Sequence, residues 1–262
     1  MKAIAPYTIG CDPEMPGFKD RKPIDLTGFL EGTKENPYVV GPQGAYQIDN
    51  VNAEFNPTPS TDVKIVVDNL FHIMKVARIR LKEMGVVLRA KSYVEFPQYY
   101  EFSESARQAG CSPDFNIYTE TENLAPMLGC ARSAGGHMAM EVPRSTNLKT
   151  FIKMCDRTVG LLSTIHDYSG RVALYGSAGS FRVHTFEETG LIEYRTPSNF
   201  WLYNREMATE ALSLFASVKD NLDVYEELNE QVGDETIRRI INRGYKDSAQ
   251  LHLDKYKELV NG

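Results

Sequence analysis

The chain has 262 residues, of which 42% are hydrophobic and 24% are charged, and its formal net charge is −6. This composition is typical of a globular protein that buries a sizeable core, as one large domain or two small ones. The negative balance argues against a general nucleic-acid or membrane-surface binder, although it leaves room for a local basic groove.

The four cysteines show none of the paired spacings, such as Cys-x-x-Cys, that zinc sites use. They are Cys11, Cys111, Cys130 and Cys155. We therefore expect neither a zinc site nor a disulfide framework, and a reducing cytosol is the natural setting. The amino-terminal apolar run is too short for a signal peptide, and no apolar run approaches the length of a membrane span. These features predict a cytoplasmic protein without a membrane segment.

The first predicted strand covers residues 5–12 and ends in the sequence Gly-Cys-Asp-Pro-Glu. Pro13 cannot donate to a sheet ladder, so it suits a strand end or an edge. Asp12 and Glu14 are two residues apart, and in an extended chain their side chains point to the same face. Two carboxylates on one face repel each other unless they are protonated or neutralised by a cation. A polar turn is the alternative interpretation.

A second acidic stretch follows a predicted loop at 16–36 and a predicted hairpin at 38–48. In residues 49–57, which include Asp49 and Glu54, apolar residues alternate with Asn and Glu, so we expect a strand with one strongly polar face. Asn and Glu are poor strand formers, which suggests that another requirement selects them. A solvent-facing edge strand is the alternative.

The middle of the chain predicts one long helix at 62–84, capped by Ser60 or Thr61, and then a strand at 86–94. Residues 97–133 are mixed and rich in Gly, Pro and Ser, and they predict a long loop with short elements. A loop of that length in a compact domain is often functional.

Two glycines precede a predicted strand that carries His137, within Ser-Ala-Gly-Gly-His-Met-Ala-Met-Glu at 133–141. Glycines there allow close approach of the backbone. A lone histidine is more often a structural residue than a ligand. Its placement on a strand beside paired glycines nevertheless makes His137 a candidate ligand.

The second half of the chain is mainly helical. We expect helices at 147–166, 199–218, 221–231, 234–242 and 246–259, and a short strand at 172–175. Short antiparallel strands and hairpins with long helices inserted between them predict an α+β fold rather than a doubly wound parallel sheet. The charges of the last helices fit solvated faces and indicate no chemistry.

Residues 191–199 predict a strand that places Glu193 and Arg195 on one face. A surface ion pair is the simplest interpretation. However, the upstream loop at 176–182 contains Gly176, Gly179 and Arg182. It matches neither a P-loop nor a dinucleotide-binding fingerprint.

The polar strand faces together contain many carboxylates, one histidine and two arginines. They are Asp12, Glu14, Asp49, Glu54, His137, Arg182, Glu193 and Arg195. Hard oxygen ligands with one histidine suit Mg²⁺ or Mn²⁺. Arginines beside such ions suit phosphate oxygens, and the combination is typical of phosphoryl transfer.

The order of these motifs resembles glutamine synthetase-like carboxylate–amine ligases, the superfamily that includes glutamate–cysteine ligase, and most closely its phage-associated amidoligases. The resemblance runs from Tyr7 to about Phe200 through short motifs. Residues 10–14 resemble the family's first acidic strand, and residues 49–57 resemble its second acidic segment. In that family, two carboxylates two residues apart in the first strand hold a metal.

The later motifs resemble the family with two departures. The strand of His137 resembles a Gly-x-His-x-His strand, but Ala139 replaces the second histidine. Residues 175–182 and 193–195 resemble a motif pair in which arginines bind phosphates and the glutamate binds a metal. Leu191 stands where glutamine synthetases carry another arginine, so the phosphate contacts are fewer or arranged differently.

The resemblance implies a glutamine synthetase/guanidino kinase-like α+β fold, in which an antiparallel sheet forms a concave site and helices cover its outer face. It implies one catalytic domain over 1–262, with a core at 5–218 and a helical region at 219–262. The implied metal ligands are Asp12, Glu14, Asp49, Glu54, His137 and Glu193. Arg182, Glu193 and Arg195 would act in catalysis, and the implied nucleotide contacts are Arg182, Arg195, Arg132, Arg171, Gly176 and Gly179.

The implied activity is ATP- and Mg²⁺- (or Mn²⁺-) dependent amide formation through an acyl phosphate, between a small-molecule or peptide carboxylate and an amine. The resemblance also implies a cytoplasmic protein, or one in the host cytoplasm if a phage encodes it. It is compatible with a homo-oligomer. A guanidino kinase-like phosphotransferase is one alternative. An inactive ligand-binding relative is another, and Ala139 favours it.

Overall fold

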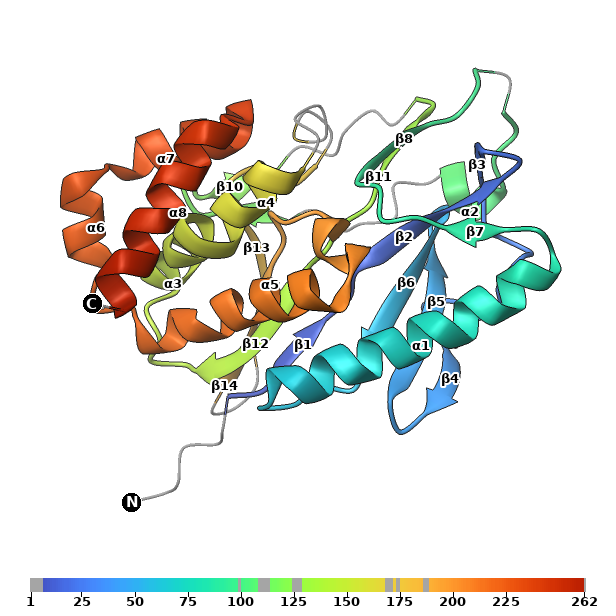
Figure 1. Cartoon of the computed structure of the whole chain (residues 1–262), viewed down its shortest axis with the longest axis horizontal. Coiled ribbons are helices and arrows are strands. Elements are labelled where there is room, and N and C mark those ends of the chain that lie inside the picture. Colours follow the sequence, from blue (N-terminus) through green and yellow to red (C-terminus); the bar gives the residue numbers. More distant parts are fainter. Residues whose placement is uncertain are drawn as a thin grey trace.

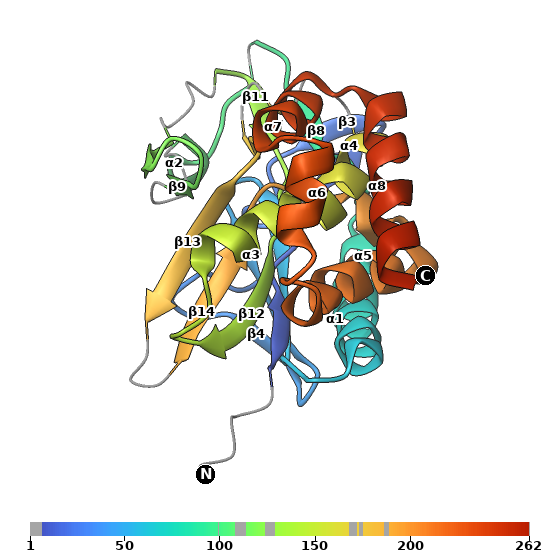
Figure 2. The same ribbon diagram turned by 90° about the vertical axis from the view of Figure 1, so that its left-hand side faces the viewer.

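The computed structural model describes residues 7–98, 100–107, 114–123, 129–167, 172, 175–185 and 189–261. Two curled antiparallel sheets carry the molecule, and helices pack on one side of them (Figures 1 and 2). This arrangement confirms the predicted α+β class. No helix among the described residues is both long and apolar enough to span a membrane.

The first sheet has six strands in the order β1-β12-β14-β13-β9-β10, and each neighbouring pair is antiparallel. Its strands are β1 (Ile9–Cys11), β9 (Phe115–Asn116), β10 (Thr121–Glu122), β12 (Met138–Pro143), β13 (Ser180–Thr185) and β14 (Thr189–Tyr194). Strands that are distant in sequence therefore lie side by side at its centre.

The second sheet follows the order β3-β2-β6-β5-β4, and β7 also pairs with β2. Its strands are β2 (Glu14–Lys19), β3 (Lys22–Ile24), β4 (Tyr38–Gly41), β5 (Gly44–Asp49), β6 (Asn52–Pro57) and β7 (Val87–Leu88). A separate two-stranded ribbon joins β8 (Tyr93–Glu95) to β11 (Ala131–Ser133).

The chain passes from the first sheet to the second between β1 and β2, at Asp12 and Pro13. The backbone N–H of Asp12 donates to the carbonyl of His137 (3.3 Å), and that of Glu14 donates to Gly135 (2.9 Å). The carbonyl of Pro13 accepts from Phe55 of the second sheet (3.0 Å). Because Pro13 has no N–H to lose from a ladder, it suits this crossing point. The crossing places Asp12 and Glu14 at the seam between the sheets.

Helices cover the face of the sheets that carries the apolar side chains. They are α1 (Val63–Glu83), α2 (Glu104–Arg107), α3 (Leu148–Cys155), α4 (Leu161–His166), α5 (Arg205–Ser217), α6 (Tyr225–Gln231), α7 (Asp234–Arg243) and α8 (Lys246–Asn261). Helix α1 crosses β5 and β6, while α3 to α8 gather beside the first sheet (Figures 1 and 2). Shorter turns are the π-helix Asp156–Gly160 and the 3-10 helices Asn199–Tyr203 and Val218–Asp220. One apolar core contains buried residues of both sheets and of the carboxy-terminal helices.

Several element predictions were wrong in their details. The predicted loop at 16–36 contains most of β2 and all of β3, whereas the short elements expected within the loop at 97–133 are α2, β9, β10 and β11. Part of the Gly-rich segment 176–182 is strand β13. Asp62 rather than Ser60 or Thr61 caps α1, because its side chain accepts the N–H of Lys64. The predicted strand at 172–175 lies partly outside the described residues.

Candidate functional site

Two groups of three metal-ligating side chains lie at the seam between the sheets. The first group is Asp12, His137 and Glu193, and the second is Glu14, Asp49 and Glu54. Within each group the ligand atoms all lie within 4.8 Å of one another. The six residues are those that the sequence analysis selects as metal ligands, so the structure brings all of them into two compact clusters.

Strand register builds the first cluster. Glu193 of β14 is paired with Arg182 of β13 on one side and with Ala139 of β12 on the other. Directly paired residues of an antiparallel sheet share a face, and so do residues two apart on one strand. His137, two residues before Ala139, therefore lies on the same face as Glu193.

Basic side chains surround Glu193. The Nδ1 atom of His137 lies 3.4 Å from Glu193 Oε1 and 3.5 Å from Asp12 Oδ2. Arg182 Nη1 is 3.6 Å from Glu193 Oε2, and Arg195 Nη1 donates to Glu193 Oε1. Since Glu193 and Arg195 are both buried, this ion pair is shielded from water and salt.

In the first cluster, Asp12 is a partly buried carboxylate that lacks a full set of hydrogen-bond donors or positive partners. Burial raises the pKa of Asp12 to about 6, although the positive charges of Arg195 and Arg182 oppose the shift. Its Oδ1 atom is buried and has no hydrogen-bond partner within the described part of the chain. A buried acceptor without a donor is costly, and a cation at this position would remove that cost.

The second cluster is richer in negative charge. Glu14 of β2 and Glu54 of β6 are directly paired, which places two carboxylates on one face of the sheet. Burial, followed by the charge of Asp49, raises the pKa of Glu14 to about 8. Burial and the charges of Asp12, Glu14 and Asp49 raise the pKa of Glu54 well above its usual value. The influence of Asp12 on Glu54 also shows that the two clusters interact electrostatically.

Mostly neutral groups hold the second cluster in place. Gln47 Nε2 donates to Glu54 Oε1 (2.8 Å), and Asn52 Nδ2 donates to Glu14 Oε2 (2.8 Å). The ammonium of Lys34 lies 2.9 Å from Asp49 Oδ1 and is partly exposed. Amide donors orient carboxylates without cancelling their charge. Carboxylate oxygens and one imidazole are the donors that Mg²⁺ and Mn²⁺ prefer, so the residues present fit divalent cations.

The other predicted nucleotide contacts have different surroundings. Arg132 donates to the carbonyls of Gly129, Ala131 and Ala106 and to Asn50, so it fixes local backbone instead of joining the clusters. The N–H of Gly179 donates to Asp156 Oδ1 (3.1 Å), which engages that donor inside the protein. Gly176 has a φ of 79°, a conformation that favours glycine. Arg171 lies outside the described residues.

Three residues near the clusters were not predicted. His184 Nε2 lies 3.9 Å from Glu193 Oε2, and Asp114 Oδ2 lies 3.8 Å from Arg195 Nε. The third residue is Lys34. His184 could have been found, because it follows Arg182 by two residues and residues two apart share a strand face. Asp114 and Lys34 lie in predicted loops, where no periodicity indicates direction.

The fold and the two clusters define the protein at the level of class, as an α+β protein with a candidate two-cation site flanked by arginines. Comparison with known proteins gives no matching family model and no matching curated protein. Solved structures that are similar to this chain include glutamine synthetase from Plasmodium falciparum, at 9% identity and a TM-score of 0.42, over 83% of this chain and 51% of that one. Another is GmaS, determined without ligand, at 11% identity and a TM-score of 0.40, over 96% of this chain and 69% of that one. The chain thus spans about half the length of the first structure, and likenesses this weak assign no activity.

Proposed function

We propose that the protein is an ATP-dependent carboxylate–amine ligase that forms an amide bond through an acyl phosphate. The observation that carries this proposal is the meeting of two three-ligand clusters beside buried and half-buried arginines. The resemblance of the motif order to carboxylate–amine ligases agrees with it.

In this proposal the first cation would be held by Asp12, His137 and Glu193, and the second by Glu14, Asp49 and Glu54. When bound, divalent cations would neutralise the triphosphate and the transferring phosphoryl group. Arg182 and Arg195 lie beside the first cluster and would bind phosphate oxygens, for which the guanidinium offers several fixed donors. Arg195 is fixed between Glu193 and Asp114, so little side-chain freedom would be lost on binding.

The reaction has two balanced steps. A carboxylate oxygen of the substrate attacks the terminal phosphorus of ATP, the bond to the bridging oxygen breaks, and ADP leaves. The amine nitrogen then attacks the acyl carbon, the carbon–oxygen bond to phosphate breaks, and an amide, phosphate and a proton result. The chain's own contribution is to orient the phosphates through Arg182 and Arg195 and to keep the six ligands in place.

The test is ADP release in the presence of Mg²⁺ or Mn²⁺, screened against a library of amino acids and amines, with mass spectrometry of the products. ADP release that depends on both substrates, with a product one water lighter than their sum, would support the ligase. A stable phosphorylated product without amide would instead indicate a guanidino kinase-like phosphotransferase. Absence of Mg²⁺-dependent ATP binding by calorimetry would indicate an inactive relative and overturn the proposal.

A further inference from the structure

The segment that follows β14, at residues 195–199, contacts both sheets at their seam. On the side of the first sheet, the N–H of Gly136 donates to the carbonyl of Pro197 (3.0 Å). A Cβ on Gly136 would lie 2.1 Å from the carbonyl oxygen of Ser198, so this close approach requires glycine. The segment therefore packs directly against the backbone that leads into His137.

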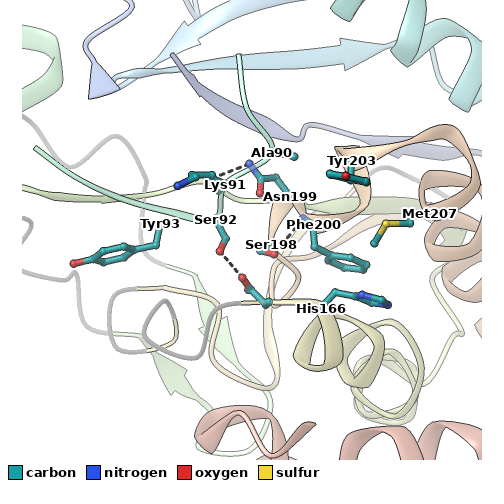
Figure 3. Close-up of a pocket in the computed structure, with 11 residues that line it drawn as sticks. Ala90, Lys91, Ser92, Tyr93, His166, Ser198, Asn199, Phe200, Tyr203 and Met207 are labelled. Carbon is teal, nitrogen blue, oxygen red and sulfur yellow. Dashed lines mark hydrogen bonds between the residues drawn. The ribbon is translucent and has the colours of Figure 1, made fainter. Parts of the chain in front are cut away.

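On the side of the second sheet, the contact is made by the side chain of Asn199. This residue is fully buried, and Figure 3 shows its side chain extending toward the backbone of Lys91. Its Nδ2 donates to the backbone carbonyls of Glu14 (2.7 Å) and Lys91 (3.1 Å). Because both partners are acceptors, the amide must present its nitrogen to them. Asn199 thus contacts the backbone of a candidate ligand of the second cluster.

The two carbonyls lie just beyond the paired part of β2 and β7. The two segments run antiparallel, and the N–H of Arg89 donates to the carbonyl of Pro16 (3.2 Å). Two residues further along each segment, the carbonyls of Glu14 and Lys91 both contact the same nitrogen. Two acceptors cannot pair with each other, and among neutral side chains only the primary amides of Asn and Gln carry two N–H bonds on one atom. Asn199 therefore extends the contact between these segments as far as Glu14.

Glu14 needs this support because the other carboxylates of its cluster repel it. It is paired directly with Glu54, and Asp49 belongs to the same group. Its N–H donates to the carbonyl of Gly135 (2.9 Å), and its carbonyl accepts from Asn199, so its backbone is held on both sides. A ligand whose backbone is fixed loses less freedom when a cation binds.

We propose that Asn199 is a positioning residue for the second cation, because its Nδ2 fixes the backbone of Glu14. It acts through Glu14 and not on the cation itself. The inference rests on the proposed two-cation site. It adds that one stretch of chain, which includes Glu193 and Asn199, serves both clusters.

The test is Mn²⁺ binding to the full chain, measured by calorimetry and by the EPR signal of free Mn²⁺. Two reference variants assign the affinities, because His137→Gln weakens the first cluster and Glu54→Gln weakens the second. Asn199→Ala removes both donors and should weaken the second affinity about tenfold, the usual effect of deleting a partner that orients a metal ligand. It should leave the first affinity within about twofold. Asn199→Asp keeps the shape of the side chain without its NH₂ group and should weaken the same affinity.

The control for a general loss of stability is Thr164→Val in α4. Thr164 Oγ1 is a buried donor to the carbonyl of Gly160 (2.9 Å), and neither residue belongs to a cluster. This variant should leave both Mn²⁺ affinities unchanged. Urea unfolding of all variants shows that each is folded under the conditions of the titration.

The outcomes separate this inference from the proposed function. A wild-type chain that binds no Mn²⁺ would overturn both. A wild-type chain that binds two Mn²⁺, with both affinities unchanged in Asn199→Ala and Asn199→Asp, would overturn the positioning role alone. Equal losses at the two clusters, or the same loss in Thr164→Val, would show that Asn199 only stabilises the fold and would also overturn it.

Discussion

The two carboxylate clusters have similar ligands and different electrostatic surroundings. In the first, Arg182, Arg195 and His137 lie close to Glu193. In the second, amide donors contact Glu14 and Glu54, and the only cation in contact with the cluster within the described residues is the partly exposed Lys34, beside Asp49. The first cluster is therefore close to charge balance without a metal, whereas the second needs protons or a cation.

The seam between the sheets therefore combines two kinds of site. The first cluster is held in place by ion pairs, whereas the carboxylates of the second cluster repel one another. The arginines hold the Glu193 side chain in position through ion pairs, so its geometry can exist before any cation binds. Amide donors fix the positions of Glu14 and Glu54, but because these donors are neutral the two carboxylates still repel each other. A cation that relieves this repulsion would stabilise the fold as well as fill the site.

The largest expected effect is on the proposed activity. Glu193→Ala removes the carboxylate that His137, Arg182 and Arg195 all approach. We expect ATP turnover to fall at least about 100-fold, the usual effect of deleting a group that stabilises a transition state, while the protein stays folded. Coupled measurement of ADP release checks this. Glu122→Ala, on the exposed strand β10, is the matched control, and full activity of Glu193→Ala would remove the metal assignment.

The next effect is a pH dependence of stability in metal-free protein. The folded-state pKa of Glu14 is raised to about 8 and that of Asp12 to about 6, so the folded protein holds protons that the unfolded chain has released. Their contribution is therefore fully present below about pH 4 and is lost as the pH rises to about 8. We expect metal-free protein to lose on the order of 4 kcal/mol of unfolding free energy between pH 5.5 and 8.5 through these groups.

Urea denaturation at the two pH values, with and without Mn²⁺, measures this effect. Mn²⁺ should restore stability at pH 8.5 and do little at pH 5.5, because protons then occupy the carboxylates. Glu14→Gln should flatten the pH dependence. A metal-free protein that is more stable at pH 8.5 than at pH 5.5, with Glu14→Gln showing the same rise, would contradict the charge imbalance of the second cluster.

Paired neutral substitutions test the contrast between the clusters directly. Glu54→Gln removes one of three repelling carboxylates, and Gln47 and Asn56 can still donate to the remaining oxygen. We expect it to raise the stability of metal-free protein at pH 8.5 by about 1–2 kcal/mol and to weaken Mn²⁺ binding. Glu193→Gln leaves the buried Arg195 without its closest charged partner and should lower stability by about 2–4 kcal/mol.

Thermal and urea unfolding of both variants at pH 8.5 give these values, and calorimetry gives the Mn²⁺ affinities. Glu122→Gln provides the baseline for an exposed strand position. Changes of the same sign in Glu54→Gln and Glu193→Gln would mean that the two clusters do not differ as described.

The candidate ligands could be predicted because strands display them with a period of two. Glu193 and Arg195 are two residues apart and contact each other, as a strand period of two predicts. Asp12 and Glu14 are also two apart, but they join different clusters because the chain passes from one sheet to the other between them. The pairing of distant strands, such as Glu14 with Glu54, depends on tertiary structure and has no local signal. Local patterns could not show which of these residues meet in space, and the resemblance to a family was needed to group them into one metal site.

Strands β2 and β13 were predicted as loops because glycine and proline occur in or beside them. Pro16 and Gly17 predict a loop, yet both belong to β2. A Cβ on Gly17 would lie 2.3 Å from the side chain of Leu26, so packing rather than a turn requires this glycine. At Gly179 a Cβ would also lie too close to a side chain, 2.6 Å from Tyr118, and this glycine in addition has a positive φ of 78°. Glycines selected for close packing therefore hid part of β2 and the start of β13, and with β13 the position of His184.

The smallest expected effect concerns Lys34, whose ammonium lies 2.9 Å from Asp49 and competes with a cation for that carboxylate. Because Lys34 is partly exposed, its ion pair with Asp49 is worth no more than about 1 kcal/mol. We therefore expect Lys34→Gln to tighten Mn²⁺ binding about two- to fivefold at pH 7.5, measured by calorimetry, with a loss of less than about 1 kcal/mol in metal-free stability. Lys64→Gln, which removes an exposed pair with Asp68, should change neither quantity measurably. Weaker Mn²⁺ binding in Lys34→Gln would mean that Lys34 holds Asp49 in position for the cation instead of competing with it, and the second cluster would then be preorganised like the first.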